Sequence, residues 1–267
     1  MTDLNGIELT LHIAAPPGVV FRYFSDPERF RVWMGPDSEL DLEIGGGLVV
    51  RYPNDAPPAR GEVVEVEPDR RIAFTWGYTG GANGLDVGAS TVAVTLDPLH
   101  GGTRLTVRHT GLPNRALEEG HLGGWRHYFG VLAWRAAQEA LAPVLDARVD
   151  AFVAAWNEED PGRRRSLLEE CWTPEGLFVD RMGYVPGRDA LDTFIANAQR
   201  FMPGVALERT GPVRETHGRV HFPWRLTGPD GVIGEGLDVG RMDGEGRFLE
   251  LAGFWEERGA GGGAPGV

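Results

Sequence analysis

Pro143 interrupts what would otherwise be one continuous helical pattern near the middle of the 267-residue chain. Proline has no backbone N–H and its ring clashes with the preceding helical turn, so a helix ends or kinks there. Before this point, strand-like runs lead into one long helix; after it, helices come first and strands last. Because the order of elements reverses, we predict two different α+β domains, residues 1–143 and 144–257, and no internal repeat.

The first half consists of short runs in which apolar and polar residues alternate, as in "IELTLHIAA" and "ASTVAVTLDP". Clusters of Gly, Pro, Asn and Asp separate these runs, which is typical of an antiparallel meander. A helix over about residues 116–141 follows, with apolar residues at steps of three and four along one face. They are Leu122, Trp125, Phe129, Leu132 and Ala136. We predict a curved antiparallel sheet packed on this helix, with space for a cavity between them.

The second half begins with helical patterns and ends in strands. Three helices are predicted, over residues 146–160, 163–172 and 188–201. Four strand-like runs follow, over residues 204–215, 219–228, 231–242 and 247–257. The tetrapeptides "GPDG" and "DGEG", which begin at Gly228 and Asp243, are typical of hairpin turns. Residues 258–267 are rich in Gly and are predicted to be disordered.

The charged residues exclude several classes of function. The net charge is −13 and no basic patch is present to neutralise phosphates, so we expect neither nucleic acid nor an anionic membrane as a partner. All 26 basic residues are Arg, which excludes Schiff-base chemistry, Lys-anchored pyridoxal phosphate and the P-loop Lys. No apolar run approaches the ~20 residues of a membrane span. The first residues lack the pattern of a secretory signal, so we expect a soluble, cytoplasmic protein.

Five blocks of the first half carry a resemblance to a known superfamily. They are "APPGVVFRYFSDPERFRVWMGP", "EIGGG", "GEVVEVEPDRRIAFTW", "GGTRLTVRHTGL" and "GHLGGWRHYFGVL". In this order, over about residues 7–141, they resemble the SRPBCC (START-like) superfamily, in the branch related to the C-terminal domain of the activator of heat-shock protein 90 ATPase. The resemblance implies a helix-grip fold with a hydrophobic cavity between sheet and long helix. It does not name the ligand, because ligands in this superfamily are diverse.

Aromatic residues of the first half are candidates for lining that cavity, with plain core packing as the alternative. They are Trp33, Trp76, Trp125, Tyr128 and Phe129. His109 and His127 are weaker candidates for polar contacts there. The polar, Gly-rich segment 77–90 is either a flap over the cavity or a solvent loop.

Three pieces of the second half resemble the nuclear transport factor 2-like superfamily, in its SnoaL-like branch. They are "FVAAWNEED", "LFVDRMGYVPGRDALDTFI" and "GLDVGRMDGEGRFLELAGFW". The resemblance covers about residues 147–256 and implies a cone-shaped α+β barrel. Polyketide cyclases belong to this branch, and ketosteroid isomerase is a relative.

This second resemblance implies roles for two aspartates. Asp180 aligns with the general base of the isomerase-like members, and Asp238 aligns with the second acid of their oxyanion site. Burial in an apolar cavity raises the pKa of a carboxyl group, so one acid can stay neutral and donate a hydrogen bond while the other accepts a proton. The alternatives are a turn residue for Asp180 and an Asp bonded to backbone for Asp238.

One position departs from the pattern of the relatives. Where the isomerase has a Tyr hydroxyl on its first helix, this chain has Phe152. Loss of such a donor costs on the order of a hundredfold in rate, so we do not expect steroid isomerisation itself. We expect Phe152, Trp156, Phe178 and Trp224 to line the cavity of the second domain.

The histidines and the cysteine indicate no metal site. His217 and His221 are predicted to share the outward face of one strand, and His121 and His127 lie on different faces of the long helix. Cys171 is the sole Cys, so it forms no internal disulfide, and we expect it to be buried. Since no CxxC or HExxH is present, we predict no metal and no other cofactor.

Three functions remain open. The first is binding of an apolar small molecule, such as a polyketide-like or other natural-product intermediate. It includes cofactor-free cyclisation, isomerisation or dehydration in the second domain, with Asp180 and Asp238 as catalytic residues. The second is binding or sequestration without catalysis, as in self-resistance. The third is an interaction protein, either co-chaperone-like or a homodimer formed through the sheet of the second domain.

Overall fold

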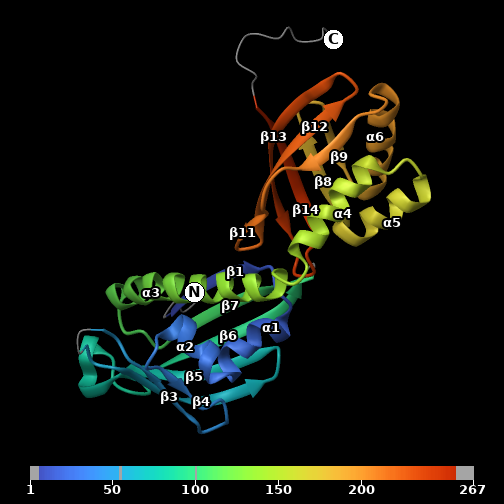
Figure 1. Ribbon diagram of the computed structural model, residues 1–267. Helices are drawn as coiled ribbons and strands as arrows, with labels where there is room; N and C mark the ends of the chain where they lie inside the picture. The colour runs from blue at the N-terminus through green and yellow to red at the C-terminus, as the bar shows by residue number, and fades with distance from the viewer. Residues whose placement is uncertain (1–5, 54–55, 100, 257–267) are drawn as a thin grey trace, which may run out of the picture. The chain divides into compact units, whose positions relative to one another are not determined.

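The computed structural model describes residues 6–53, 56–99 and 101–256. The chain forms two compact units, Met1–Leu141 (unit 1) and Ala142–Val267 (unit 2), each with its own sheet and helices (Figure 1). In the described ranges, no helix combines the length and the apolar character needed to cross a bilayer. The Gly-rich segment 258–267, predicted to be disordered, lies outside the described residues.

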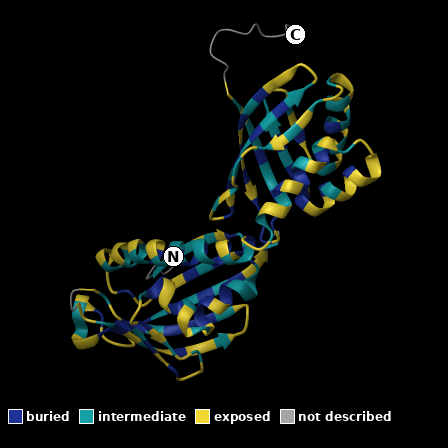
Figure 2. Ribbon diagram, viewed as in Figure 1, coloured by how far each residue is buried: buried dark blue, intermediate teal, exposed yellow. Residues whose placement is uncertain are grey.

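Unit 1 is built on a seven-stranded antiparallel sheet in the order β1-β7-β6-β5-β4-β3-β2. The strands are β1 (Gly6–Ile13), β2 (Glu39–Leu40), β3 (Gly47–Val50), β4 (Ala59–Glu67), β5 (Arg71–Tyr78), β6 (Ser90–Leu99) and β7 (Gly102–Thr110). Buried and more exposed residues alternate along strands such as β6, as Figure 2 shows, so one face of the sheet is packed. The predicted antiparallel sheet of the first half is confirmed.

Three helices complete unit 1: α1 (Pro17–Ser25), α2 (Pro27–Met34) and α3 (Arg115–Leu141). The carboxylate of Asp26 caps α2, because its Oδ1 accepts hydrogen bonds from the backbone N–H groups of Glu28 and Arg29. The long helix α3 spans the predicted segment and buries one apolar face, which includes Phe129 and Leu132. A long helix packed on an antiparallel sheet makes unit 1 helix-grip-like.

Unit 2 combines three helices with a mixed sheet in the order β10-β12-β13-β14-β8-β9, and β11 pairs with β12. The helices are α4 (Leu145–Asn157), α5 (Pro161–Cys171) and α6 (Arg188–Phe201). The strands are β8 (Trp172–Asp180), β9 (Gly183–Pro186), β10 (Ala206–Arg209), β11 (Arg214–Thr216), β12 (Arg219–Gly228), β13 (Gly231–Met242) and β14 (Phe248–Trp255). Only β14 and β8 pair in parallel among the described strands. The hairpin turns predicted after Gly228 and at Asp243 are confirmed.

Two predicted strands are wrong in length. The run 38–44 forms only the short β2, because the chain turns back where Gly46 N donates to Glu43 O and Gly45 has a φ of 86°. The run 204–215 is divided into β10 and β11, since Gly211 and Pro212 lie between them and Pro cannot donate to a ladder.

The prediction that His217 and His221 share one strand face is also wrong. His217 and Gly218 have φ values of 52° and 72° and form the two-residue turn between β11 and β12. Positive φ at both central residues is what a tight hairpin turn requires. His221 alone lies in β12, on the face opposite to the buried Phe222 and Trp224.

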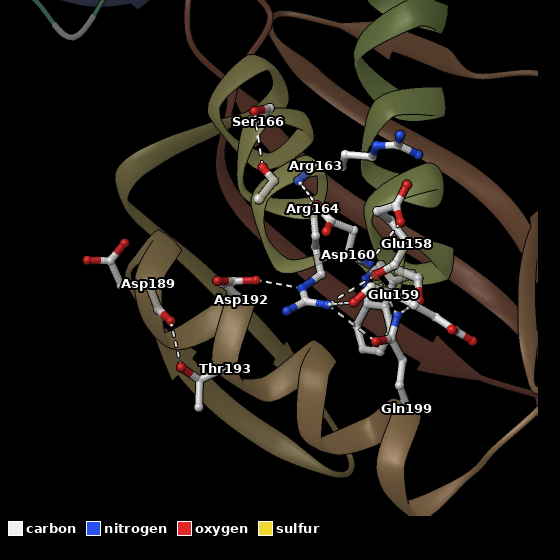
Figure 3. Close-up of polar contacts among 12 residues, drawn as sticks. Glu158, Glu159, Asp160, Arg163, Arg164, Ser166, Asp189, Asp192, Thr193 and Gln199 are labelled. Atoms are coloured by element: carbon white, nitrogen blue, oxygen red, sulfur yellow. Dashed lines mark hydrogen bonds and ion pairs between the residues drawn. The ribbon is translucent and has the colours of Figure 1, made fainter.

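A buried arginine holds the helices of unit 2 together (Figure 3). Arg164 on α5 is 4% exposed, and its Nε donates to Oδ1 of Asp192 on α6 at 2.6 Å. Its Nη1 donates to the carbonyl oxygen of Glu158, just after α4, at 3.1 Å. Gln199 on α6 donates to the carbonyl oxygens of Trp156 and Glu158 at 2.9 and 3.0 Å. This network joins α4, α5 and α6 and fixes Gln199 beside the cavity described next.

Candidate functional site

Unit 2 contains a mostly apolar cavity of about 60 Å³ between its sheet and the helices α4 and α6. The residues predicted for this domain all line it: Phe152, Trp156, Phe178, Asp180, Trp224 and Asp238. The free volume has room for only a few water molecules, so a larger ligand requires lining side chains to move. Met182 and Met202 also line the cavity, and flexible Met side chains adapt readily to such a change.

Asp180 lies at the end of β8, where the chain turns into β9. Its Oδ1 accepts hydrogen bonds from the backbone N–H groups of Met182 and Gly183 at 2.7 and 2.9 Å. Its Oδ2 lies 3.5 Å from Nε1 of Trp255, which donates to it. Asp180 therefore acts as a turn residue through one oxygen and contributes to the cavity wall. The turn role predicted as one alternative for Asp180 is confirmed, and its role as a base stays a prediction.

Asp238 lies in the middle of β13 and is 5% exposed. Its neighbours along the inward face of this strand are glycines, Gly234, Gly236 and Gly240, so no other side chain of the strand lies next to the carboxyl group. Burial raises the pKa of Asp238 to about 8; the nearby indole N–H of Trp224 opposes this shift and the carboxylate of Asp180 adds to it. At neutral pH Asp238 is therefore mostly protonated and has an O–H to donate.

The two aspartates flank a residue that has no side chain. Gly253 on β14 is the register partner of Asp238 on β13. A Cβ placed at Gly253 would lie 3.1 Å from Oδ1 of Asp238 and 3.2 Å from Cβ of Asp180. Both carboxyl groups thus face the same space above the middle strand, and that space exists because position 253 is Gly.

Trp224 on β12 supplies a second buried donor beside Asp238. The residue is 5% exposed, and its Nε1 has no hydrogen-bond partner of normal geometry among the described residues. A Cβ at Gly236 would lie 2.5 and 2.9 Å from Cζ2 and Cε2 of Trp224, so the nitrogen-bearing side of the indole packs against β13. Gly236 and Asp238 are two residues apart on the same strand face. The unpaired N–H is therefore positioned near the Asp238 carboxyl group.

Phe152 closes the inner end of the cavity. It is 1% exposed and its ring lies 5.6 Å from those of Trp172 and Phe248, with Phe178 at 6.4 Å. A hydroxyl donor is absent at this position because the side chain is Phe. The polar groups with unused hydrogen-bonding capacity near the two aspartates are therefore indole N–H groups.

Asn157 and Gln199 line the same cavity but already have structural partners. Asn157 donates to the carbonyl oxygen of Leu207 at 2.8 Å and accepts from its N–H at 2.8 Å, which fixes β10 to the end of α4. Gln199 belongs to the Arg164 network. The side chains of these two residues are therefore committed to structural hydrogen bonds in the cavity wall.

Unit 1 contains a separate and larger cavity, of about 490 Å³. Three of the predicted aromatic residues, Trp76, Trp125 and Tyr128, line it. Trp33 and Phe129 do not: they are 3% and 0% exposed, and their rings pack against each other at 5.2 Å in the core. The Nε1 of Trp33 is moreover bonded to the carbonyl oxygen of Tyr23. The prediction that Trp33 and Phe129 line a cavity is therefore corrected to core packing.

His109 and Ser90 form a buried contact in unit 1, at 2.8 Å between Nε2 and Oγ. It is not a nucleophile–base pair, because Trp125 Nε1 donates to Nδ1 of His109 and Ser90 Oγ donates to the carbonyl oxygen of Trp76. Nε2 therefore carries the proton and donates to Ser90. Burial lowers the pKa of His109 to about 3, so the ring stays neutral. His127, the other weak candidate, is exposed and does not line the cavity.

Several lining residues were missed from the sequence. Trp255 and Gly253 belong to the alternating pattern of the last strand, in which Leu251 is the buried member, and this alternation was the available signal. In unit 1 the missed residues include His121, Tyr52 and Tyr78. His121 shares a helix face with Trp125 and Tyr128, which helical spacing does indicate.

The sole cysteine lies in the core of unit 2. Cys171 is 0% exposed, as predicted, and burial raises the pKa of its thiol to about 12, so it is not a reactive thiolate. Within the described part of the chain, no three His, Cys, Asp or Glu side chains come together in a way that suits a metal ion.

Unit 1 has the sheet, the long helix and the internal cavity of a helix-grip-like α+β domain, a class typical of ligand-binding proteins. The family model described as Activator of Hsp90 ATPase homolog 1-like protein matches residues 14–135. The N-terminal unit therefore contains an AHSA1-like domain of the SRPBCC superfamily, which confirms the resemblance predicted for the first half. The SnoaL-like character of the second half stays a prediction.

Solved structures with related sequences include three that illustrate the range of similarity. An AHSA1-like protein from Rhizobium etli is 37% identical, with a TM-score of 0.40, and the match covers 49% of this chain and 81% of that one. A SnoaL-like family protein from Agrobacterium tumefaciens is 31% identical, with a TM-score of 0.40, over 42% of this chain and 97% of that one. An HSP90 activator from Plasmodium falciparum is 25% identical, with a TM-score of 0.40, and the match covers 46% of this chain and 90% of that one. The comparison with curated proteins found no match.

Proposed function

We propose that unit 2 is a SnoaL-like domain with the cone-shaped nuclear transport factor 2-like fold. It binds an apolar small molecule, such as a polyketide-like intermediate, and moves a proton within it without a cofactor. The observation that carries the proposal is that Asp180 and Asp238 line one apolar cavity on either side of Gly253. The reaction class is a cyclisation, isomerisation or dehydration that starts at a carbon next to a carbonyl group.

In the proposed reaction Asp180 is the base. Its Oδ1 is held by two backbone N–H groups, so Oδ2 is the oxygen that accepts the proton. A C–H bond of the substrate breaks, its electron pair moves into the carbonyl group, and the proton goes to Oδ2. Return of the same proton to another carbon completes an isomerisation with no net change in atoms or electrons.

The negative charge that develops on the substrate oxygen needs hydrogen-bond donors. The protonated carboxyl group of Asp238 is one donor, because burial keeps its pKa near 8. The unpaired indole N–H of Trp224 is the second. In this arrangement the indole N–H of Trp224, on β12, donates a hydrogen bond to the oxyanion. In the relatives a Tyr hydroxyl at the position of Phe152 supplies this hydrogen bond.

Sequestration without catalysis is the second candidate. It is favoured by the two backbone hydrogen bonds to Asp180, which give that carboxylate a structural task in the turn. The two candidates differ in what happens to a bound ketone such as 2-tetralone in D₂O. Catalysis predicts that the protein accelerates exchange of the α-hydrogens of the ketone. It also predicts that the Asp180→Asn variant binds the ketone but does not accelerate this exchange. Sequestration predicts exchange at the buffer rate with either protein.

We further propose that unit 2 forms a homodimer through the outer face of its sheet. Leu237 and Phe254 are register partners on β13 and β14 and are 36% and 60% exposed. Val239, two residues along the same face, is 39% exposed. Exposed apolar side chains that adjoin one another on a sheet favour burial against a second protein surface.

A further inference from the structure

Arg181 lies between two residues that line the cavity of unit 2, Asp180 and Met182, and its own side chain is exposed. Its guanidinium carbon lies 3.8 Å from the centroid of the Trp255 ring, which is a cation–π contact. Trp255 on β14 forms part of the cavity wall. The guanidinium group of Arg181 therefore lies where the cavity meets solvent.

The indole ring of Trp255 is a fixed support for this guanidinium group. Its Nε1 donates to Oδ2 of Asp180 at 3.5 Å, and its ring meets that of Trp224 edge-to-face at 4.9 Å. A Cβ at Gly234 would lie 2.8 Å from Cε3 of Trp255, so the benzene side of the indole packs directly on β13. Because these contacts hold the ring in one orientation, a guanidinium group stacked on it loses less conformational freedom when it binds a ligand.

The guanidinium group of Arg181 has unused hydrogen-bonding capacity. It forms no ion pair and no side-chain hydrogen bond with any of the described residues. Stacking on an aromatic ring uses the flat face of a guanidinium group and leaves the N–H groups at its edge free. Those N–H groups suit the two oxygens of a carboxylate, which they bind side by side. The side chain of Arg181 is therefore available to an anionic group at the mouth of the cavity.

The interior of the same cavity disfavours an anion. Asp180 and Asp238 are the ionisable side chains among the described residues that line it, and none of those lining residues is basic. A negatively charged group inside would be repelled by the carboxylate of Asp180 and would lose its hydration without gaining a counter-charge. An anionic substituent of a ligand is therefore expected to stay outside the cavity, where Arg181 lies.

We propose that the ligand of unit 2 is a ketone that carries a carboxylate, and that Arg181 binds this carboxylate at the mouth while the apolar part and the ketone occupy the cavity. The inference rests on the ligand binding proposed for unit 2 and adds a specificity-determining residue to that site. A free volume of about 60 Å³ does not enclose a two-ring molecule, so part of such a ligand reaches the mouth. The site thereby selects an acid over a neutral ketone with the same ring system.

The test compares 6-carboxy-2-tetralone, which is an anion at neutral pH, with its uncharged methyl ester. Each ketone is titrated into the full-length protein by calorimetry, at low salt and at about 0.5 M salt. We expect the acid to bind about three- to tenfold more tightly than the ester, and high salt to reduce this ratio because the ion pair is exposed to solvent. Equal affinities, or tighter binding of the ester, overturn this inference and leave the proposed function standing. Binding of neither ketone contradicts both.

Two variants with the same change in net charge assign the preference to one residue. Arg181→Gln should bind the acid and the ester equally, with an affinity for the ester within about twofold of the wild type. Arg219→Gln is the control, because Arg219 is exposed on the face of β12 opposite to the buried Val220 and Phe222, away from the cavity. It should keep the preference of the wild type. A preference for the acid that survives in Arg181→Gln, or that is lost equally in Arg219→Gln, overturns the inference.

Discussion

Asp180 on β8 and Asp238 on β13 face one another across a strand position that carries no side chain. A Cβ at the intervening Gly253 would lie 3.2 Å from Cβ of Asp180 and 3.1 Å from Oδ1 of Asp238. One of these carboxyl groups is held by backbone N–H groups of a turn, and the other is buried among glycines and indole rings. Burial favours the protonated form of Asp238, which can donate a hydrogen bond.

The first prediction concerns Gly253→Ala. The added methyl group occupies the space between the two carboxyl groups and forces one of them to move by a few tenths of an ångström. We expect at least about a tenfold loss of ketone binding or proton exchange, measured by titration with 2-tetralone and by exchange in D₂O. Gly47→Ala is the control, because a Cβ at Gly47 meets nothing within 4 Å. Wild-type activity in Gly253→Ala would show that the shared space is not needed.

The second prediction concerns the stability of unit 2. Arg164→Ala leaves the carboxylate of Asp192 without its buried partner, so we expect the free energy of unfolding to fall by about 3 kcal/mol or more. The neighbouring Arg165 is 49% exposed and pairs with Glu169 and Asp189 at the surface. Arg165→Ala should therefore cost about 1 kcal/mol or less. Urea unfolding of both variants measures the difference, and equal losses would contradict the role assigned to the buried pair.

The third prediction is that the two units respond to pH in opposite directions. The pKa of Asp238 is raised to about 8, so unit 2 binds a proton that the unfolded chain releases near pH 4. Its stability should fall as the pH rises from about 4 to 8, by roughly 1.4 kcal/mol per pH unit, and then level off. The pKa of His109 is lowered to about 3, so unit 1 should lose stability as the pH falls from about 6.5 to 3.

Calorimetric melting of the whole chain across this pH range tests the prediction. Asp238→Asn should remove the loss of stability of unit 2 between about pH 4 and 8 and leave unit 1 unchanged. A loss of the same size over this pH range in Asp238→Asn would show that another group causes it.

The fourth prediction concerns the proposed homodimer. Phe254→Glu places a charge in the exposed apolar face of the sheet and should convert a dimer into a monomer in sedimentation velocity. Phe201→Glu is the control, since Phe201 on α6 is 86% exposed and lies outside that sheet face. A wild-type protein that sediments as a monomer contradicts the proposal, and so does a Phe254→Glu variant that stays dimeric.

Much of the fold follows from local patterns in the sequence. Helix α3 was predictable because Trp125, Phe129 and Leu132 recur at helical spacing, and the turns at Gly228 and Asp243 were predictable because Gly-rich tetrapeptides separate apolar runs. The turn at His217 was not predictable in this way. A non-Gly residue at positive φ carries a weak local signal, and the pairing of β11 with β12 decides the conformation there.

The candidate site was predictable only in part. Asp180 and Asp238 were singled out through a resemblance, but the sequence does not show that Gly253 lies between them. This placement depends on the parallel pairing of β14 with β8, which is distant in the chain. The same reason explains the errors for Trp33 and Phe129. Whether an aromatic residue faces a cavity or the core depends on neighbours brought in by other elements, which periodicity does not report.

The most direct test of the account is proton exchange into 2-tetralone in D₂O, followed by NMR, with the wild-type protein, Asp180→Asn and Asp238→Asn. Asn at position 180 retains an oxygen that can accept the two backbone hydrogen bonds, so this variant should fold and bind the ketone. We predict accelerated exchange in the wild type, none above the buffer rate in Asp180→Asn, and a loss of about a hundredfold or more in Asp238→Asn. Equal exchange by the wild type and Asp180→Asn, or none by the wild type, would contradict the central claim.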